Sequence, residues 1–368
     1  MTKSAEEKVL DGSVWEEFCD SLKEAGKLID AEKAPKDAFN RAEGYRYLTR
    51  MLRANLESML EYSDKDFPVL RCTCHETIKL GADNPDNYYQ SAPLNPELEY
   101  RIVGARNTVP YLSFCAVNNQ YAQGKGITVE GFIDANQMDV DADGNIEVLL
   151  SQKEQSGNWL QLLPTTNQII VRQTFKDRPN EQRAEIKIER IDKGIATPPP
   201  LSPEKLVQSL EGAGRALINI PKIFEDWSES MLETENQLPQ GDQSFFRMLG
   251  GDPNIHYFHS YWSLSDDEVL LLEAPVPDCD TWNFQLDNWW MESLDYVNHT
   301  IHKNKYTAAY ETDGSVKVVV SHRDPGHANW IDTAGHNNGT MCWRWIDAKS
   351  HPDISATVMK YDEFVSKI

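Results

Sequence analysis

The proline-rich run TPPPLSP at residues 197–203 divides the 368-residue chain into two parts with the same order of predicted elements. Proline favours the extended polyproline II conformation and cannot donate to a β-ladder, so the run is typical of a stiff linker. Before it, apolar residues at helical spacing predict helices over residues 14–29 and 36–62. From residue 67 onward β-branched and aromatic residues increase and turn signals recur, which predicts a series of short strands.

The part after the linker repeats this arrangement. Apolar residues at helical spacing predict one helix over residues 203–217 and another over residues 221–238. A strand-like texture returns at residue 256 and continues to residue 359. Helices followed by strands therefore occur twice along the chain, which suggests an internal duplication.

Individual residues support the duplication. The offset between matched residues is 170 up to Ser151 (for example 284 − 114), and it grows by one residue at each of two later points. The matched positions are Phe114 with Phe284, Asn118 with Asn288, Asp143-Gly144 with Asp313-Gly314, Ser151 with Ser321, Asn158-Trp159 with Asn329-Trp330, and Arg172 with Arg344. We therefore predict an α+β fold, mainly antiparallel β, with two tandem β-rich units each preceded by helices, over residues 1–196 and 203–368.

The composition limits the partners that the chain can have. Asp and Glu number 58 against 36 Lys and Arg, a formal net charge of -22. A field of that sign repels phosphate backbones and anionic lipid surfaces, so we expect neither nucleic acid nor a membrane as a partner. Residues 1–10 lack an apolar run, no apolar stretch approaches about 18 residues, and the six cysteines are scattered. These features favour a cytoplasmic protein with reduced thiols.

Long strings in the second part resemble one protein family. They are WNFQLDNWWMESLDY at residues 282–296, DGSV at 313–316, HRDPG at 322–326, NWIDTAGH at 329–336 and MCWRW at 341–345. Together they are similar to the signature of the family called domain of unknown function 1214. The resemblance extends through most of the chain, including Asn158-Trp159 and Val171-Arg172. It implies a β-sheet-rich protein and provides no catalytic residues that can be transferred to this sequence.

Familiar catalytic and cofactor-binding motifs do not account for the chain. We find no Walker A string, no Gly-x-Gly-x-x-Gly between a strand and a helix, no Gly-x-Ser-x-Gly and no His-Glu-x-x-His. Residues 139–147 begin like a calcium loop, but the glutamate stands three residues after the glycine, so we predict a hairpin turn. The string Cys72-Thr73-Cys74-His75 has no second cysteine pair, which favours buried thiols. No metal site and no specific cofactor are indicated.

The second copy holds the candidate catalytic residues, because it carries eight of the nine histidines. His322 and Asp324 end a predicted strand, and His336 follows in a glycine-containing loop. These three residues fit a His/Asp acid–base pair. They fit equally a site with two histidines and one carboxylate that binds iron. The remaining interpretation is a salt-bridged turn with structural histidines.

Polar and aromatic residues of the second copy are the candidate substrate-binding groups. Gln285, Asn288 and Arg344 are predicted polar anchors, and Trp282 and Trp290 are predicted stacking walls. We therefore expect an enzyme that acts on a small apolar or aromatic molecule by acid–base chemistry, in the second unit or between the units. One alternative is iron- or haem-dependent oxidation of such a molecule. Another is a non-catalytic β module that binds carbohydrate or protein.

Overall fold

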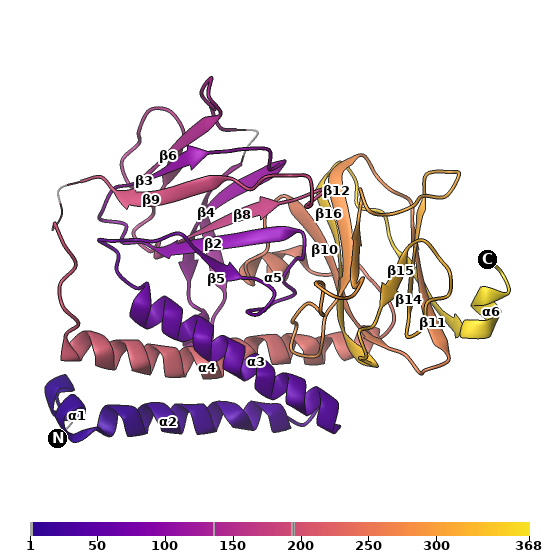
Figure 1. Ribbon diagram of the computed structural model, residues 1–368, viewed down its shortest axis with the longest axis horizontal. Coiled ribbons are helices and arrows are strands. Elements are labelled where there is room, and N and C mark those ends of the chain that lie inside the picture. The colour runs from indigo at the N-terminus through magenta and orange to yellow at the C-terminus, as the bar shows by residue number, and fades with distance from the viewer. Residues whose placement is uncertain (1–2, 135–136, 193, 195) are drawn as a thin grey trace. The chain divides into compact units, whose positions relative to one another are not determined.

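The structure is a computed structural model that describes residues 3–134, 137–192, 194 and 196–368. Its contacts divide the chain into two compact units. The first unit consists of Met1–Ala31, Tyr45–Ile78 and Asp86–Ile223, and the second of Glu32–Gly44, Lys79–Pro85 and Phe224–Ile368. Two short segments of the N-terminal part thus belong to the second unit. The predicted α+β fold with two tandem β-rich units preceded by helices is confirmed (Figure 1).

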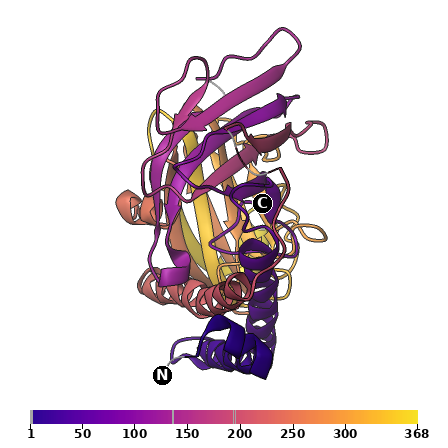
Figure 2. The same cartoon turned by 90° about the vertical axis from the view of Figure 1, so that its left-hand side faces the viewer.

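The helices precede the strands of each repeat. The first set is α1 (Ala5–Asp11), α2 (Ser13–Gly26) and α3 (Ala38–Leu56), drawn in indigo and violet in Figure 2. The second set is α4 (Pro203–Met231) and α5 (Gln243–Met248), and α6 (Tyr361–Val365) ends the chain. Among the described residues, no helix combines the length and apolar character needed to cross a bilayer.

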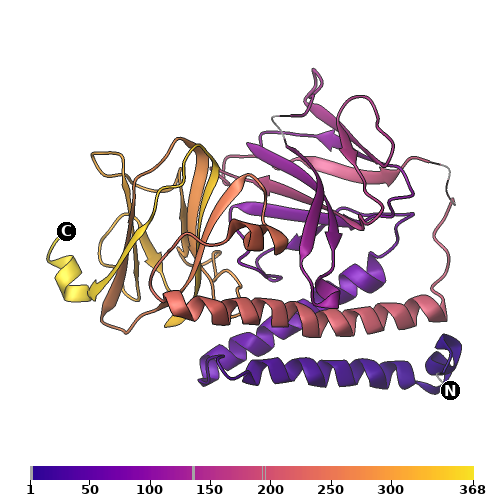
Figure 3. The ribbon, with the colours of Figure 1, turned by 180° about the vertical axis from the view of Figure 1, so that it is seen from behind.

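Helix α4 corrects one expectation. Helices were predicted over residues 203–217 and 221–238, but the structure has a single helix that continues through Pro221 to Met231 (Figure 3). A proline removes one hydrogen bond from a helix interior. Here the helix continues because apolar side chains on both sides of it, including Leu217, Ile220 and Phe224, are buried.

The first unit contains two sheets that enclose an apolar core. One has the order β1 (Arg71–Cys74), β2 (Asn87–Pro93), β8 (Gln168–Thr174), β4 (Tyr111–Asn119) and β5 (Ile127–Asp134). The other has the order β7 (Trp159–Gln161), β6 (Asn145–Ser151), β3 (Tyr100–Ala105) and β9 (Glu185–Arg190). Phe114 and Val171 of the first sheet pack in one cluster with Ile102 and Val148 of the second.

The second unit repeats this design. Its first sheet has the order β10 (Ile255–Ser263), β16 (Asn338–Ala348), β12 (Cys279–Leu286) and β13 (His302–Asn304). Its second sheet has the order β15 (Trp330–Asp332), β14 (Val316–Ser321), β11 (Glu268–Ala274) and β17 (Ser355–Lys360). Phe284, Trp343, Leu272 and Val318 belong to the apolar cluster of this unit.

The pairing of the strands supports duplication at the level of single residues. Ser113 pairs with Arg172 in the first unit, and Asn283 pairs with Arg344 at the matching place in the second. Asn158 Nδ2 donates to two main-chain carbonyls at 2.8 and 2.9 Å. Asn329 Nδ2 donates at 2.7 Å to the two carbonyls that lie 170 positions later (309 − 139 and 317 − 147). The two repeats therefore share strand order, register and the bonds of this asparagine.

Candidate functional site

Six buried side chains form a polar layer on one face of the sheet β10-β16-β12. Successive residues of a strand point to opposite faces, so the residues between the core aromatics lie on the face away from the apolar cluster. We call this set the polar face. It consists of Asn283 and Gln285 of β12, Asp287 directly after β12, Cys342 and Arg344 of β16, and His259 of β10. None of the six is more than 7% exposed. A buried polar layer of this kind must satisfy its own hydrogen bonds.

Hydrogen bonds connect the polar face into a network. Arg344 Nη1 donates to Gln285 Oε1 at 2.6 Å and to Asn283 Oδ1 at 3.3 Å. Gln285 Nε2 donates to Asp287 Oδ1 at 2.5 Å. The guanidinium group and the carboxyl group are therefore connected through one amide side chain, which fixes the orientation of all three.

The segment Lys79–Pro85 covers this network within the second unit. Arg344 Nη2 donates to the carbonyl of Ala82 at 2.5 Å, and Gln285 Nε2 donates to the carbonyl of Asp83 at 2.9 Å. Asn283 Nδ2 donates to Asn84 Oδ1 at 2.6 Å. These bonds join residues about 200 to 260 positions apart in the sequence, so the segment is a structural part of the second unit.

Gly81 allows the covering segment to pass close to helix α4. Its φ of 63° lies in the left-handed region, and a Cβ atom there would lie 2.9 Å from the ring of Phe224. Gly144 also has a left-handed φ, 83°, but a Cβ atom there would meet nothing within 4 Å. An alanine at position 144 therefore adds backbone strain without a steric clash. We expect Gly81→Ala to lower the free energy of unfolding by about 1–3 kcal/mol more than Gly144→Ala, because it adds overpacking to strain.

Urea unfolding of the two variants beside the unchanged chain measures this difference. Equal losses in the two variants would mean that the Phe224 ring moves aside without cost, and the close approach would then have no energetic weight.

Asp83 adds a second buried carboxyl group beside the polar face. Its Oδ1 accepts from the amide of Ser293 at 2.9 Å, and its Oδ2 accepts from the Ser293 hydroxyl at 2.8 Å. Burial raises the pKa of Asp83, and the nearby charge of Lys79 opposes that shift. Lys79 Nζ itself donates to the carbonyls of Ser293 and Leu294, both at 2.7 Å.

Asp287 has the environment of a proton donor. Burial raises its pKa, the Gln285 hydrogen bond and the charge of Arg344 oppose that shift, and the neighbouring Asp83 adds to it, so that the resulting pKa is about 8. Its Oδ2 atom is buried and has no hydrogen-bond partner among the described residues. At neutral pH the carboxyl group is therefore mainly protonated, with one oxygen atom free to donate a proton.

His259 has the environment of a proton acceptor. Burial lowers its pKa well below the ordinary value, and the charge of Arg344 lowers it further. Its Nε2 lies 3.6 Å from Cys342 Sγ, and its Nδ1 is buried with no hydrogen-bond partner in the described parts of the chain. Burial raises the pKa of the Cys342 thiol to about 12. Both groups are therefore neutral at pH 7.

Aromatic rings surround the His259 imidazole. The ring of Trp227 in α4 lies 4.6 Å from it and that of Phe246 in α5 lies 5.0 Å from it, measured between centroids. Tyr257 stacks on it at 5.8 Å from the same strand. The polar groups thus meet an apolar wall, which is the composition typical of sites for small organic molecules.

The predicted catalytic residues lie around a neighbouring turn, outside the polar face. His322 Nε2 lies 3.2 Å from the carbonyl of Leu264, which can only accept, so Nε2 carries the proton. His322 Nδ1 then accepts from the Thr333 hydroxyl at 2.9 Å. The amide of His336 donates to the carbonyl of Thr333 at 3.0 Å. The exposed Asp324 accepts from the amide of Gly326 at 2.8 Å. Thr333 thus connects the two histidines.

A His/Asp pair of the expected chemical type is made by His299 and Asp332. His299 Nδ1 lies 2.7 Å from Asp332 Oδ2, with side chains 40% and 23% exposed. In the described part of the chain, no three His, Cys, Asp or Glu side chains are grouped so that they could hold a metal ion. The 139–147 stretch is a turn leading into β6, in which Asp141 accepts from the amides of Asp143 and Asn145.

The predicted substrate-binding residues separate into two groups. Gln285 and Arg344 lie together on the polar face, as described above. Trp282 lies on the opposite face of β12, in the apolar cluster, with its ring stacked on Trp343 at 4.9 Å. Trp282 and Gln285 are three residues apart, so strand alternation places them on opposite faces.

Asn288 and Trp290 belong to the turn that follows β12. Asn288 Oδ1 accepts from the amides of Trp290 and Glu292 at 2.9 and 3.1 Å, so it organises this turn. Trp290 is buried, and its Nε1 donates to the carbonyl of Asn40 at 3.4 Å. The same alternation that separates Trp282 from Gln285 would have identified Asp287, two residues after Gln285. No local sequence signal indicates that Asp83 lies beside Asp287 and the rest of the polar face.

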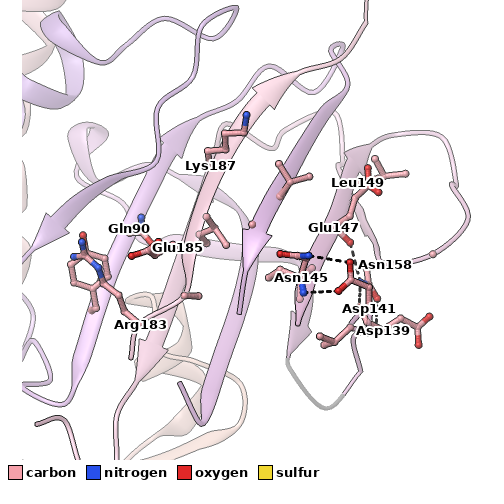
Figure 4. Close-up of a pocket in the computed structure, with 18 of the residues that line it drawn as sticks. Gln90, Asp139, Asp141, Asn145, Glu147, Leu149, Asn158, Arg183, Glu185 and Lys187 are labelled. Carbon is pink, nitrogen blue, oxygen red and sulfur yellow. Dashed lines mark hydrogen bonds between the residues drawn. The ribbon is translucent and has the colours of Figure 1, made fainter. Parts of the chain in front are cut away.

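The first unit contains an open groove with a volume of about 990 Å³. Its lining comes from β2, β3, β6 and β9 and from the loops beside them. Figure 4 shows Arg183, Gln90 and Glu185 at one end of the groove, and Asp139, Asp141 and Asn158 at the other. The predicted residues of the second unit do not line it.

Two solved structures of other proteins are similar to the chain to different degrees. A crystal structure of an uncharacterized protein from Burkholderia cenocepacia is 46% identical, with a TM-score of 0.95 over 98% of this chain and 100% of that one. The VPA0106 protein from Vibrio parahaemolyticus is 9% identical, with a TM-score of 0.48 over 92% of this chain and 100% of that one. No curated protein matches the chain.

A family model also matches the sequence, once in each repeat. Its description is "Protein of unknown function (DUF1214)", and it matches residues 82–174 and 271–350. The first match contains β2 to β8, and the second extends from β11 through β16. The chain therefore belongs to the DUF1214 family.

Proposed function

We propose that the chain is an acid–base enzyme for a small apolar or aromatic carbonyl compound, with Asp287 as proton donor and His259 as proton acceptor. One observation carries this proposal: two buried titratable groups on one sheet face each have a free polar atom, Asp287 Oδ2 and His259 Nδ1. The raised pKa keeps Asp287 protonated and the lowered pKa keeps His259 unprotonated at neutral pH, so the two groups are in the states that an acid and a base need.

The strand register supports the placement of the two groups. His259 pairs with Cys342, and Cys342 pairs with Gln285 on the other side of β16. Asp287 follows Gln285 by two residues and therefore points to the same face. Two strand spacings separate the backbones of β10 and β12, about 10 Å. The register therefore places the proposed acid and base on one face, on either side of Cys342.

The chemistry of the neutral forms indicates a carbonyl substrate. A protonated carboxyl group can donate a hydrogen bond to a carbonyl oxygen and stabilise the negative charge that develops there. His259 Nδ1 takes a proton from the carbon next to the carbonyl, and the Asp287 proton passes to the oxygen. The resulting enol returns its hydroxyl proton to Asp287 and regains a carbon-bound proton from His259. The enzyme and its proton count are then restored.

The residues around this centre have supporting roles in the proposal. Arg344 and Gln285 hold the Asp287 carboxyl group, and Trp227 and Phe246 give an apolar wall beside the base. We assign the acid–base role here and not to His322 and Asp324, because both His322 ring nitrogens contact internal partners.

Deuterium exchange tests this function without knowledge of the natural substrate. Small aromatic ketones such as phenylacetone are incubated with the protein in D2O, and deuterium at the carbon next to the carbonyl is followed by NMR. We expect exchange that falls by about 100-fold or more in Asp287→Asn and in His259→Gln. His322→Gln and Asp324→Asn are the controls and should keep the activity. Exchange that persists in the first two variants and disappears in the controls would reverse the assignment.

A further inference from the structure

The groove of the first unit combines an apolar floor with free hydrogen-bonding groups. In register across three strands lie Lys187 of β9, Val103 of β3 and Glu147 of β6. Their neighbours Ile102, Val148 and Ile188 are in the core, so these three side chains point outward. Leu149 adds a second apolar residue beside Val103. The floor is therefore apolar at its centre and charged at both sides.

The same surface is closed in the second unit. Val269 and Val319 on the outer face of its corresponding sheet pack against Phe364 of α6, which is 4% exposed. Val319 is the counterpart of Leu149 (319 − 149 = 170), and it is completely buried. The two repeats have thus diverged at this surface. In the second unit the sheet face is apolar and lies under α6, and in the first unit the face is open and has charged borders.

Three side chains of the groove have hydrogen-bonding capacity that the described residues do not use. Gln90 is 93% buried (7% exposed), and its Oε1 accepts from Gln173 at 3.0 Å while its Nε2 donates to no described residue. The carboxylates of Glu185 and Asp139 take part in no hydrogen bond or ion pair with the described parts of the chain. The buried donor of Gln90 therefore lies with the Glu185 carboxylate at one end of the groove, and the Asp139 carboxylate lies at the other end (Figure 4).

Hydroxyl groups are the ligand chemistry that this set fits. A hydroxyl donates one hydrogen bond to a carboxylate and accepts others from an amide or a cation. Arg183 lies over the Tyr88 ring at 4.9 Å and offers further donors beside Gln90. A cationic ligand would pair with the carboxylates but would leave the Gln90 donor without an acceptor. We propose that this groove binds a short neutral oligosaccharide, with hydroxyls on Glu185, Asp139 and Gln90 and its apolar faces on Val103 and Leu149.

Titration of the full chain with neutral trisaccharides, maltotriose and cellotriose, tests the proposal by calorimetry or NMR. We expect at least one of them to bind, and the double variant Asp139→Ala/Glu185→Ala to weaken its Kd by about tenfold or more. Glu189→Ala is the matched control, because it removes a carboxylate from the same strand outside the groove lining. Its Kd should match that of the unchanged chain.

Salt dependence separates this ligand from a cationic one. Binding of a neutral sugar should change little between about 0.05 and 0.5 M salt, since no net charge is paired. Spermidine provides the contrast. If neither trisaccharide binds at tens of millimolar, or if spermidine alone binds and about 0.5 M salt abolishes it, the groove is only an acidic surface and the proposal is wrong. Sugar binding that the double variant leaves unchanged overturns it as well.

Discussion

Asp287→Asn should make the protein more stable at pH 8 than the unchanged chain, although it alters a completely buried residue. The folded-state pKa of about 8 lies above the ordinary value of 3.8. Between these two pH values the folded chain keeps a proton that the unfolded chain releases. The contribution of this proton to the free energy of unfolding is therefore fully present below about pH 4, and it is lost as the pH rises through 8. The loss is on the order of 5 kcal/mol. Asparagine keeps an acceptor for Gln285 and has no charge to bury.

Urea unfolding at pH 5 and pH 8 measures this effect. Between pH 5 and pH 8, we expect the free energy of unfolding of the unchanged chain to fall by several kcal/mol more than that of the variant. Asp278→Asn is the control, because Asp278 is exposed and its pKa is lowered by Lys349. A variant that is destabilised equally at both pH values would show that Asp287 is ionised in the folded chain, and the acid–base proposal would lose its proton donor.

Arg344→Met should cause the largest loss of stability among single substitutions on the polar face. It removes donors from Gln285, Asn283 and the carbonyl of Ala82, and leaves those acceptors buried. A buried polar group without its partner costs about 1–3 kcal/mol, so the total expected loss is about 3–5 kcal/mol. Methionine fills a similar volume, which separates the loss of hydrogen bonds from a packing defect.

Arg215→Met is the control for this substitution. Arg215 is an exposed helical residue, and within the described part of the chain its one ion pair is with Glu211 at 3.9 Å. Thermal and urea unfolding should show a change within about 0.5 kcal/mol for it. If Arg344→Met were equally mild, the bonds to the segment Lys79–Pro85 would contribute nothing to holding that segment in place.

The duplication could be predicted from the sequence because it depends on ordered local matches. Phe114 with Phe284 and Arg172 with Arg344 occupy equivalent places in the two sheets, as the ordered matches indicate. Such matches survive because each residue has the same role in its own strand pair. The proline run also marks the start of a helix, because Pro203 begins α4. The first unit nevertheless continues beyond the run to Ile223, which no local signal indicates.

The candidate site could be predicted only in part. Gln285 and Arg344 were identified, and they are joined at 2.6 Å. Trp282 was assigned to the site although alternation along β12 places it in the core, and the same rule applied to Asp287 would have included it. Asp83 could not be predicted, because its place depends on contacts with residues about 200 positions later that no periodic pattern records.

Direct measurement of the Asp287 carboxyl pKa decides whether this buried group carries a proton. Carbonyl ¹³C NMR of aspartate-labelled protein, with Asp287→Asn to assign the resonance, follows the carboxyl from pH 4 to pH 10. The proposed acid–base centre requires a titration near pH 8, and a titration at or below pH 5 would contradict it.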